Sequence, residues 1–252
     1  MTAPYFDKYD RKGAYHWRDY FGGLFRMNAY TRARYDIVLQ CVRESGVSPP
    51  TRLLEVGCGD GALMGVLHSA LAVAVVGVDT SGKGLDLARL MFKARGFAGE
   101  FRQIDGYGTG FADASFAVVV CSDVIEHVDD PLAMLREIRR VLVPGGRLIL
   151  TTPIKFSEKP IDVMHVQEWF TGDLIGLCRE VFGEPLQAIR SHPMLWYELV
   201  SSGNRWIGRA GRLVTNVLTK FGRNPFMERG GDWRCYTTQT LVLMKQADTS
   251  SR

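Results

Sequence analysis

The chain has 252 residues, with 31 Lys and Arg against 27 Asp and Glu, and 46% of it is hydrophobic. This composition excludes an intrinsically disordered chain, and the length suits one large α/β domain with additions. No apolar run approaches the roughly 20 residues of a membrane-spanning helix, and the polar N-terminus predicts no secretory signal. Five scattered cysteines without a CxxC pair indicate neither a disulfide framework nor a zinc site. We therefore expect a cytoplasmic protein without a bound metal.

Strands and helices alternate along most of the chain. Apolar residues at helical spacing, or helix-starting residues such as Pro131 and the expected cap Thr171, predict helices at 31–45, 62–71, 82–95, 131–143 and 171–178. Short apolar or β-branched runs predict strands at 52–56, 73–78, 101–104, 116–121, 147–152, 186–190 and 238–244. This rhythm predicts an α/β fold with a mostly parallel sheet and helices on both faces, which binds ligands at the carboxyl ends of its strands.

A glycine-rich turn between the first strand and the next helix carries the clearest chemical signal. Residues 53–61 read LLEVGCGDG. Its glycines allow a ligand to approach the backbone closely, and a helix N-terminus favours a phosphate or carboxylate. The loop alone suits either a dinucleotide or an amino-acid-like cofactor. The spacing differs from the dinucleotide pattern GxGxxG, and Glu55 can either hold an ammonium group or fix the loop.

Two further acids end the next two strands. Asp79 follows Gly57 by 22 residues and is placed to accept both hydroxyls of an adenosine ribose, as in NAD enzymes. Asp105 ends the third strand and is placed to accept the exocyclic amine of adenine. Together these acids indicate an adenosine-containing cofactor.

Five segments in order carry a family resemblance: LLEVGCGDG, VVGVDTS, FRQID, FAVVVCSDVIEHVDDP and LREIRRVLVPGGRLILTTP. Over about residues 51–153 the chain resembles class I S-adenosylmethionine-dependent methyltransferases, in the group that includes the ubiquinone-biosynthesis methyltransferases. The resemblance implies a Rossmann-like seven-stranded sheet, order 3-2-1-4-5-7-6, with 238–244 as the antiparallel strand 7. It also implies S-adenosylmethionine as cofactor and S-adenosylhomocysteine as product. The cofactor-binding residues expected from motifs and resemblance are Glu55, Gly57, Cys58, Gly59, Gly61, Asp79, Thr80, Asp105, Gly106, Ser122 and Asp123.

The chain divides into an N-terminal segment and a methyltransferase domain. Residues 1–50 are predicted to form a helical, aromatic lid segment in which Tyr15, His16 and Trp17 face the cofactor or acceptor. Packing of a leading helix into the core is the alternative. Residues 51–252 are predicted to form the catalytic domain, with acceptor-side insertions near 154–170 and 194–234.

The predicted reaction is O-methylation of a small or lipid-linked metabolite, such as a sugar, a glycolipid precursor or a phenol. His165 and His127 are the candidate catalytic bases, because a hydroxyl acceptor must lose a proton. Each could instead only order its loop. The alternatives to this function are a non-catalytic cofactor-binding or scaffold protein and an NAD-dependent oxidoreductase.

The basic excess is confined to one part of the chain. Residues 201–234 contain seven basic and two acidic residues, so that they carry +5 and the remainder of the chain −1. This distribution does not favour nucleic acid, whose enzymes spread their charge along a groove. The pattern of residues 205–223 predicts a basic amphipathic helix. Such a helix could make peripheral membrane contact or cover a phosphorylated or lipid-linked acceptor. Alternatively, it docks to the sheet and its basic face is simply solvated. The sequence indicates no oligomeric state.

Overall fold

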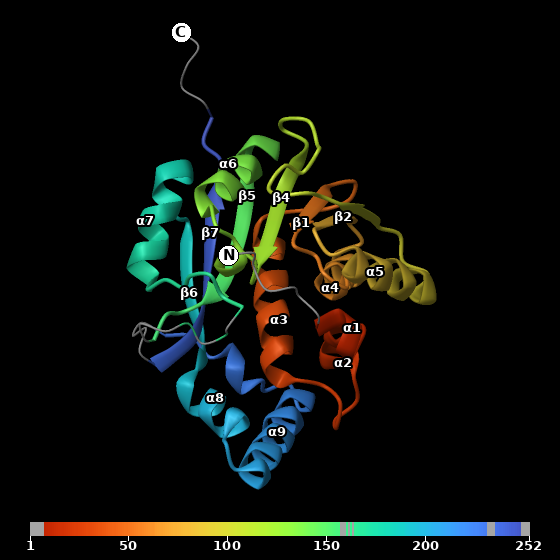
Figure 1. Ribbon diagram of the computed structural model, residues 1–252, viewed down its shortest axis with the longest axis vertical. Helices are drawn as coiled ribbons and strands as arrows, with labels where there is room; N and C mark the ends of the chain where they lie inside the picture. The colour runs from red at the N-terminus through yellow and green to blue at the C-terminus, as the bar shows by residue number, and fades with distance from the viewer. Residues whose placement is uncertain (1–7, 157–159, 161, 163, 231–234, 248–252) are drawn as a thin grey trace.

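A seven-stranded sheet forms the centre of the computed structural model, which describes residues 8–156, 160, 162, 164–230 and 235–247 (Figure 1). The predicted segments 1–50, 154–170 and 194–234 each include residues outside this set. The strands are β1 (Arg52–Val56), β2 (Ala74–Asp79), β3 (Glu100–Gln103), β4 (Phe116–Ser122), β5 (Leu142–Pro153), β6 (Gln187–Pro193) and β7 (Tyr236–Met244). Their order is β3-β2-β1-β4-β5-β7-β6, and β7 is antiparallel to both neighbours, which confirms the predicted topology.

Helices cover both faces of this sheet. They are α1 (Lys8–Lys12), α2 (Tyr15–Phe21), α3 (Ala29–Glu44), α4 (Ala62–Leu71), α5 (Gly82–Arg95), α6 (Pro131–Val141), α7 (Thr171–Phe182), α8 (Met194–Ser201) and α9 (Arg205–Lys220), with short 3-10 turns η1 (Ile125–His127) and η2 (Pro225–Met227). Successive strand residues point to opposite faces. Leu53 therefore joins the apolar cluster beneath α2, α3 and α4, while Leu54 joins the cluster beneath α6 and α7.

Local sequence signals set most of the helix ends. Asp130 caps α6 by accepting the Ala133 N–H at 2.9 Å, with Pro131 in the first turn, and Gly96 closes α5 with a φ of 66°. Two expectations are wrong in detail. Helix α6 ends at Val141, because residues 142–146 already join β5 through an irregular stretch beside β4. Thr171 is the first residue of α7, whose cap position is Phe170 and has no side-chain cap.

The strand order reverses between β1 and β4. Strand β1 pairs with β2 on one side and with β4 on the other, so the loops that follow β1 and β4 diverge. In open α/β sheets this crevice at the carboxyl ends of the strands is where ligands bind. The fold therefore places the loop after β1 beside the turn after β4.

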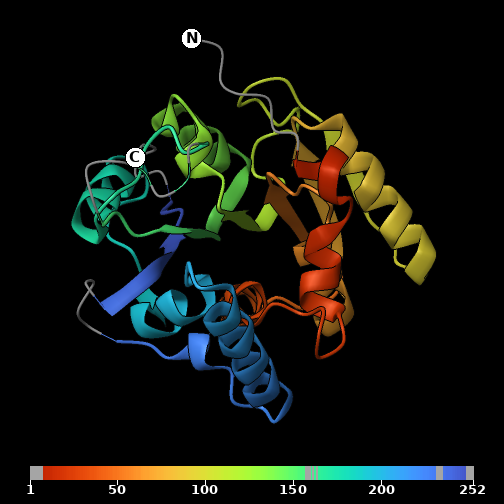
Figure 2. The same ribbon diagram turned by 60° about the horizontal axis from the view of Figure 1, so that its bottom comes forward.

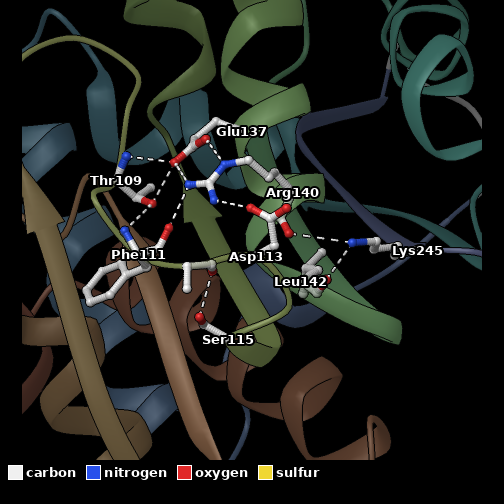
Figure 3. A network of polar contacts seen from close by, with 9 residues as sticks. Thr109, Phe111, Asp113, Ser115, Glu137, Arg140, Leu142 and Lys245 are labelled. Carbon is white, nitrogen blue, oxygen red and sulfur yellow. Dashed lines mark hydrogen bonds and ion pairs between the residues drawn. The ribbon is translucent and has the colours of Figure 1, made fainter.

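A polar network anchors the connection from β3 to β4 against α6 (Figure 3). The Arg140 guanidinium donates to both Glu137 oxygens at 2.7 Å and to the Phe111 carbonyl at 2.8 Å. The Thr109 N–H and hydroxyl donate to the same Glu137 carboxylate at 2.7 and 2.6 Å. These contacts with Arg140 lower the pKa of Glu137 to about 2. The network fixes the long loop that leads into the central strand β4.

Candidate functional site

The glycine loop after β1 is tightly built. Gly57, Gly59 and Gly61 all have positive φ angles, between 51° and 75°, which glycine adopts without strain. A Cβ on Gly57 would lie 2.3 Å from the Val124 side chain, and one on Gly59 would lie 1.8 Å from the Tyr9 hydroxyl. The loop therefore requires glycine at both positions.

Glu55 and Cys58 support this loop from within the protein. Glu55 is buried beneath the start of α4, whose own cap residue is a glycine, and among the described residues its Oε2 has no hydrogen-bond partner. Burial raises the pKa of Glu55 well above its ordinary value. Cys58 is buried with its sulfur close to Gly77 of β2.

Asp79 has the geometry expected of a ribose-binding acid. One carboxylate oxygen accepts the Gly59 N–H at 2.7 Å and the other accepts the Ser81 N–H at 2.7 Å. Each carboxylate oxygen has two lone pairs, so each can accept one more hydrogen bond. Burial raises the pKa of Asp79. The carboxylate is thus fixed by the backbone while it retains one acceptor position for each ribose hydroxyl.

The end of β3 lies directly beside Asp79. The Ile104 N–H donates to the Asp79 carbonyl at 3.0 Å, and Asp105 and Gly106 follow with exposed positions. Thr80 is also exposed, and its carbonyl accepts from the Gln103 side chain. Adenosine can donate hydrogen bonds from its two ribose hydroxyls and from its exocyclic amine. Two acids after adjacent strands can accept these hydrogen bonds. S-Adenosylmethionine would be held here through Asp79 and Asp105.

Asp60, which the sequence analysis did not select, attaches the N-terminal segment to the glycine loop. Its carboxylate accepts the His16 N–H at 3.1 Å and lies 3.2 Å from His16 Nδ1, and its carbonyl accepts Trp17 Nε1–H at 2.6 Å. Trp17 is buried against Gly65 of α4, and the Tyr15 ring contacts the His16 ring in a tilted arrangement at a centroid distance of 3.9 Å. Of the predicted lid residues, Trp17 thus occupies the core, and the other two lie at the loop.

Helix α1 connects the glycine loop with the segment that follows β5. Tyr9 is buried with its hydroxyl over Gly59. One residue earlier, Lys8 forms an ion pair with Asp162 at 3.2 Å. The two contacts hold α1 across the region between the cofactor loop and the predicted acceptor-side insertion.

At the carboxyl end of β4, Asp123 pairs with a helix far away in the sequence. Arg34 of α3 forms an ion pair with Asp123, and each side chain is only 18% exposed. Asp123 has a φ of 53°, which is unusual for a residue other than glycine. The neighbouring Ser122 hydroxyl contacts Thr151 Oγ1 at 2.8 Å. Ser122 and Asp123 therefore lie at the carboxyl end of β4, and Arg34 joins them there.

His127 and His165 lie together beside this ion pair, with ring centroids 4.9 Å apart. His127 Nδ1 donates to the Met164 carbonyl at 2.9 Å, and His165 Nδ1 lies 2.5 Å from the buried Glu168 carboxylate. A carbonyl and a carboxylate both accept, so each Nδ1 carries the proton and each neutral ring has an unprotonated Nε2. Burial lowers the pKa of His127, which favours its neutral form.

Glu126 connects the two histidine segments. It is buried, its carboxylate accepts from Thr152 Oγ1 at 3.0 Å, and its backbone carbonyl accepts the Val166 N–H at 2.8 Å. Ligand atoms of Glu126, His127 and His165 all lie within 4.8 Å of one another, so this group could hold a metal ion. The cysteine pattern predicts no metal site, and residues 126 and 165 are too far apart in the sequence for their spacing to indicate one.

The sheet order and the acids at its carboxyl edge define a class I S-adenosylmethionine-dependent methyltransferase fold, and solved structures share it. A putative sarcosine dimethylglycine methyltransferase from Galdieria sulphuraria aligns with a TM-score of 0.63 at 15% identity, covering 86% of each chain. A geranyl diphosphate methyltransferase in complex with SAM gives 0.63 at 15% identity over 84% of each chain. The [4+2]-cyclase SpnF gives 0.61 at 18% identity, over 84% of this chain and 81% of that one.

Sequence comparisons find similar proteins over part of the chain. Residues 54–150 match the family model described as a methyltransferase domain. The ubiquinone biosynthesis O-methyltransferase of Cereibacter sphaeroides is 34% identical over 122 residues, 47% of this chain and 49% of the relative. That of Ruegeria pomeroyi is 31% identical over 165 residues, 61% and 66% of the two chains. Over residues 54–150 the chain is thus similar to methyltransferase domains, and its match spans about half the length of several of these relatives.

Proposed function

We infer that the protein transfers the methyl group of S-adenosylmethionine to a hydroxyl group of a small or lipid-linked metabolite. The observation that carries this inference is the pair of imidazole rings at the carboxyl ends of β4 and β5, each with its Nδ1 engaged by an acceptor. Such engagement orients each Nε2 as a proton acceptor.

The cofactor supplies an electrophilic methyl group on a sulfonium. The chain must align the acceptor for in-line attack, exclude water and take up the hydroxyl proton. His165 is the preferred base, because the buried Glu168 carboxylate holds its ring and stabilises the imidazolium that forms. His127 lies next to it, and burial lowers the pKa of His127, which favours its neutral form.

The names of the relatives favour a phenolic hydroxyl among the acceptors considered. The chain matches only part of the length of these relatives, and the fold also occurs in the [4+2]-cyclase SpnF. The acceptor must therefore be found by experiment. No observation favours the scaffold or the NAD alternative over methyl transfer.

The test uses the full chain and cofactor labelled in the methyl group. We expect label transfer to a catechol-type phenol or its prenylated form, and tight binding of S-adenosylhomocysteine but not NAD by calorimetry. Binding of S-adenosylhomocysteine without label transfer to phenols, sugars, glycolipids or a metabolite extract would contradict the catalytic function. Tight binding of NAD alone would contradict the cofactor assignment.

A further inference from the structure

Helix α9 packs against the protein with its polar face, whereas a docked amphipathic helix ordinarily buries its apolar face. The residues that it buries are small or polar: Gly208, Gly211, Thr215, Asn216 and Thr219. The large apolar residues that it exposes are Trp206, Ile207, Leu213, Val214 and, at its C-terminal cap, Phe221. A surface helix ordinarily turns its apolar stripe to the core. The fold therefore holds this helix by its polar face and leaves the apolar face outward.

The polar face is specifically bonded, so this orientation is fixed. The Asn216 side chain accepts the Ala29 N–H at 3.2 Å and donates to the carbonyls of Leu24 and Met27, both at 2.9 Å. Gly211 allows close contact with α8, since a Cβ there would lie 2.7 Å from the Leu199 side chain. Turning the helix to bury its apolar face would leave these backbone groups without their partners.

The exposed apolar face is large and has basic residues beside it. Trp206 is 72% exposed and Phe221 is 84% exposed. Arg205, Arg209, Arg212, Lys220 and Arg223 lie on or next to the helix, and no acidic residue occurs between Leu199 and Met227. Exposed apolar patches of this kind mark interaction surfaces. An apolar face bordered by arginine and lysine matches the acyl chains and anionic headgroups of a bilayer surface.

A second copy of the chain is a poorer occupant on electrostatic grounds. A two-fold interface would place the same patch on both partners, so these five cations would face one another without acids. None of the helices in the described ranges has the length and hydropathy to cross a bilayer.

The place of the patch in the fold is also informative. Helix α8 begins directly after β6, and β6 runs parallel to β5 because both pair antiparallel with β7. Helices α8 and α9 therefore follow the carboxyl edge of the sheet, the edge that carries the candidate site. Figures 1 and 2 both place them at one end of the molecule, with α9 on its outer side.

We propose that the outer face of α9, with Trp206 and Phe221 as its apolar ends and Arg209 and Lys220 beside it, docks the protein on an anionic membrane surface. This attachment goes beyond the methyl transfer inferred above and does not depend on the identity of the acceptor.

Vesicle sedimentation of the full chain tests this attachment. We expect binding to phosphatidylcholine vesicles that contain phosphatidylglycerol, little binding to phosphatidylcholine alone, and weakening with salt. The double variant Trp206→Ser/Phe221→Ser should bind about tenfold or more weakly. Arg209→Gln and Lys220→Gln should each weaken binding about fivefold. Thermal unfolding should be unchanged, since all four side chains are exposed.

Leu90→Ser is the matched control, because Leu90 is 59% exposed on α5, away from α9. It should bind vesicles as the unmodified chain does. Absence of binding to anionic vesicles, or equal binding by the α9 double variant, would overturn the proposal. A dimer in light scattering that the double variant dissociates would assign the face to a second copy and would also overturn it.

Discussion

Arg34 of α3 and Asp123 at the end of β4 form an ion pair that is largely removed from solvent. It joins the N-terminal helices to the crevice where the strand order reverses. The paired carboxylate raises the pKa of Arg34, and burial opposes this effect. The guanidinium therefore stays charged in the fold, and its contact with Asp123 compensates for its removal from solvent.

We expect Arg34→Met to lower the free energy of unfolding by about 3–5 kcal/mol, since it leaves the Asp123 carboxylate buried without its partner. Urea denaturation measures this change. The double variant Arg34→Met/Asp123→Asn should lose clearly less than the sum of the two single variants. If Arg34→Met lowered the free energy of unfolding by less than about 1 kcal/mol, the pair would contribute no more than a solvent-exposed ion pair, and the prediction would be wrong.

The second prediction concerns cofactor affinity. Asp79→Ala removes the acceptor for the ribose hydroxyls and also releases the N–H groups of Gly59 and Ser81. We expect S-adenosylhomocysteine to bind at least about tenfold more weakly, because each charged hydrogen bond contributes about 1.5–3 kcal/mol. Calorimetry measures the affinity. Asp86→Ala, an exposed acid that pairs with Arg89 on α5, is the control and should bind normally. Unchanged affinity in Asp79→Ala would refute the ribose assignment.

The sequence predicted those features that depend on neighbouring residues. Strand and helix types, the glycine loop and the acid that ends β2 all follow from local spacing and local conformation. The sheet order came from a family resemblance over residues 51–153. Arg34 and Glu168 could not be found this way, because their roles arise from contacts across many residues or from burial. The apolar spacing correctly predicts an amphipathic helix at α9. It does not predict which face of the helix points outward, because Asn216 and its backbone partners fix that orientation.

The third prediction separates the roles of His165. We expect His165→Ala to lose most of its turnover, about a hundredfold or more for a general base, with S-adenosylhomocysteine affinity retained. Glu168→Gln removes the charge that supports the imidazolium, so it should lower kcat with little change in KM. His68→Ala is the control, because His68 bonds the Val73 carbonyl at the far end of α4.

A chelator provides the contrasting outcome for the same site. If His165 acts as a base, EDTA should leave the turnover of the unmodified protein unchanged. Loss of turnover with EDTA, restored by a divalent cation, would instead assign Glu126, His127 and His165 to a metal centre. Normal turnover of His165→Ala without chelator would restrict His165 to ordering its loop.

The last prediction is that the fold loses stability in acid through two groups. Burial lowers the pKa of His192 to about 3 from its ordinary 6.5, and its ring bonds the Ser191 hydroxyl and the Tyr30 carbonyl. The unfolded chain binds the proton first, so this stability is full above about pH 6.5 and declines as the pH falls toward 3. Contacts with Arg140 lower the pKa of Glu137 to about 2 from 4.5. Its contribution is full above about pH 4.5 and declines toward 2.

Urea midpoints measured between about pH 7 and pH 3 test both groups. His192→Gln, which keeps an amide donor for the Tyr30 carbonyl, should be less stable at neutral pH and should flatten the decline from about pH 6.5 down toward pH 3. Glu137→Gln should flatten only the decline below about pH 4.5. An exposed replacement, Asp86→Asn, should follow the unmodified protein throughout. A His192→Gln profile parallel to that of the unmodified protein would mean that His192 is not the group that titrates on unfolding.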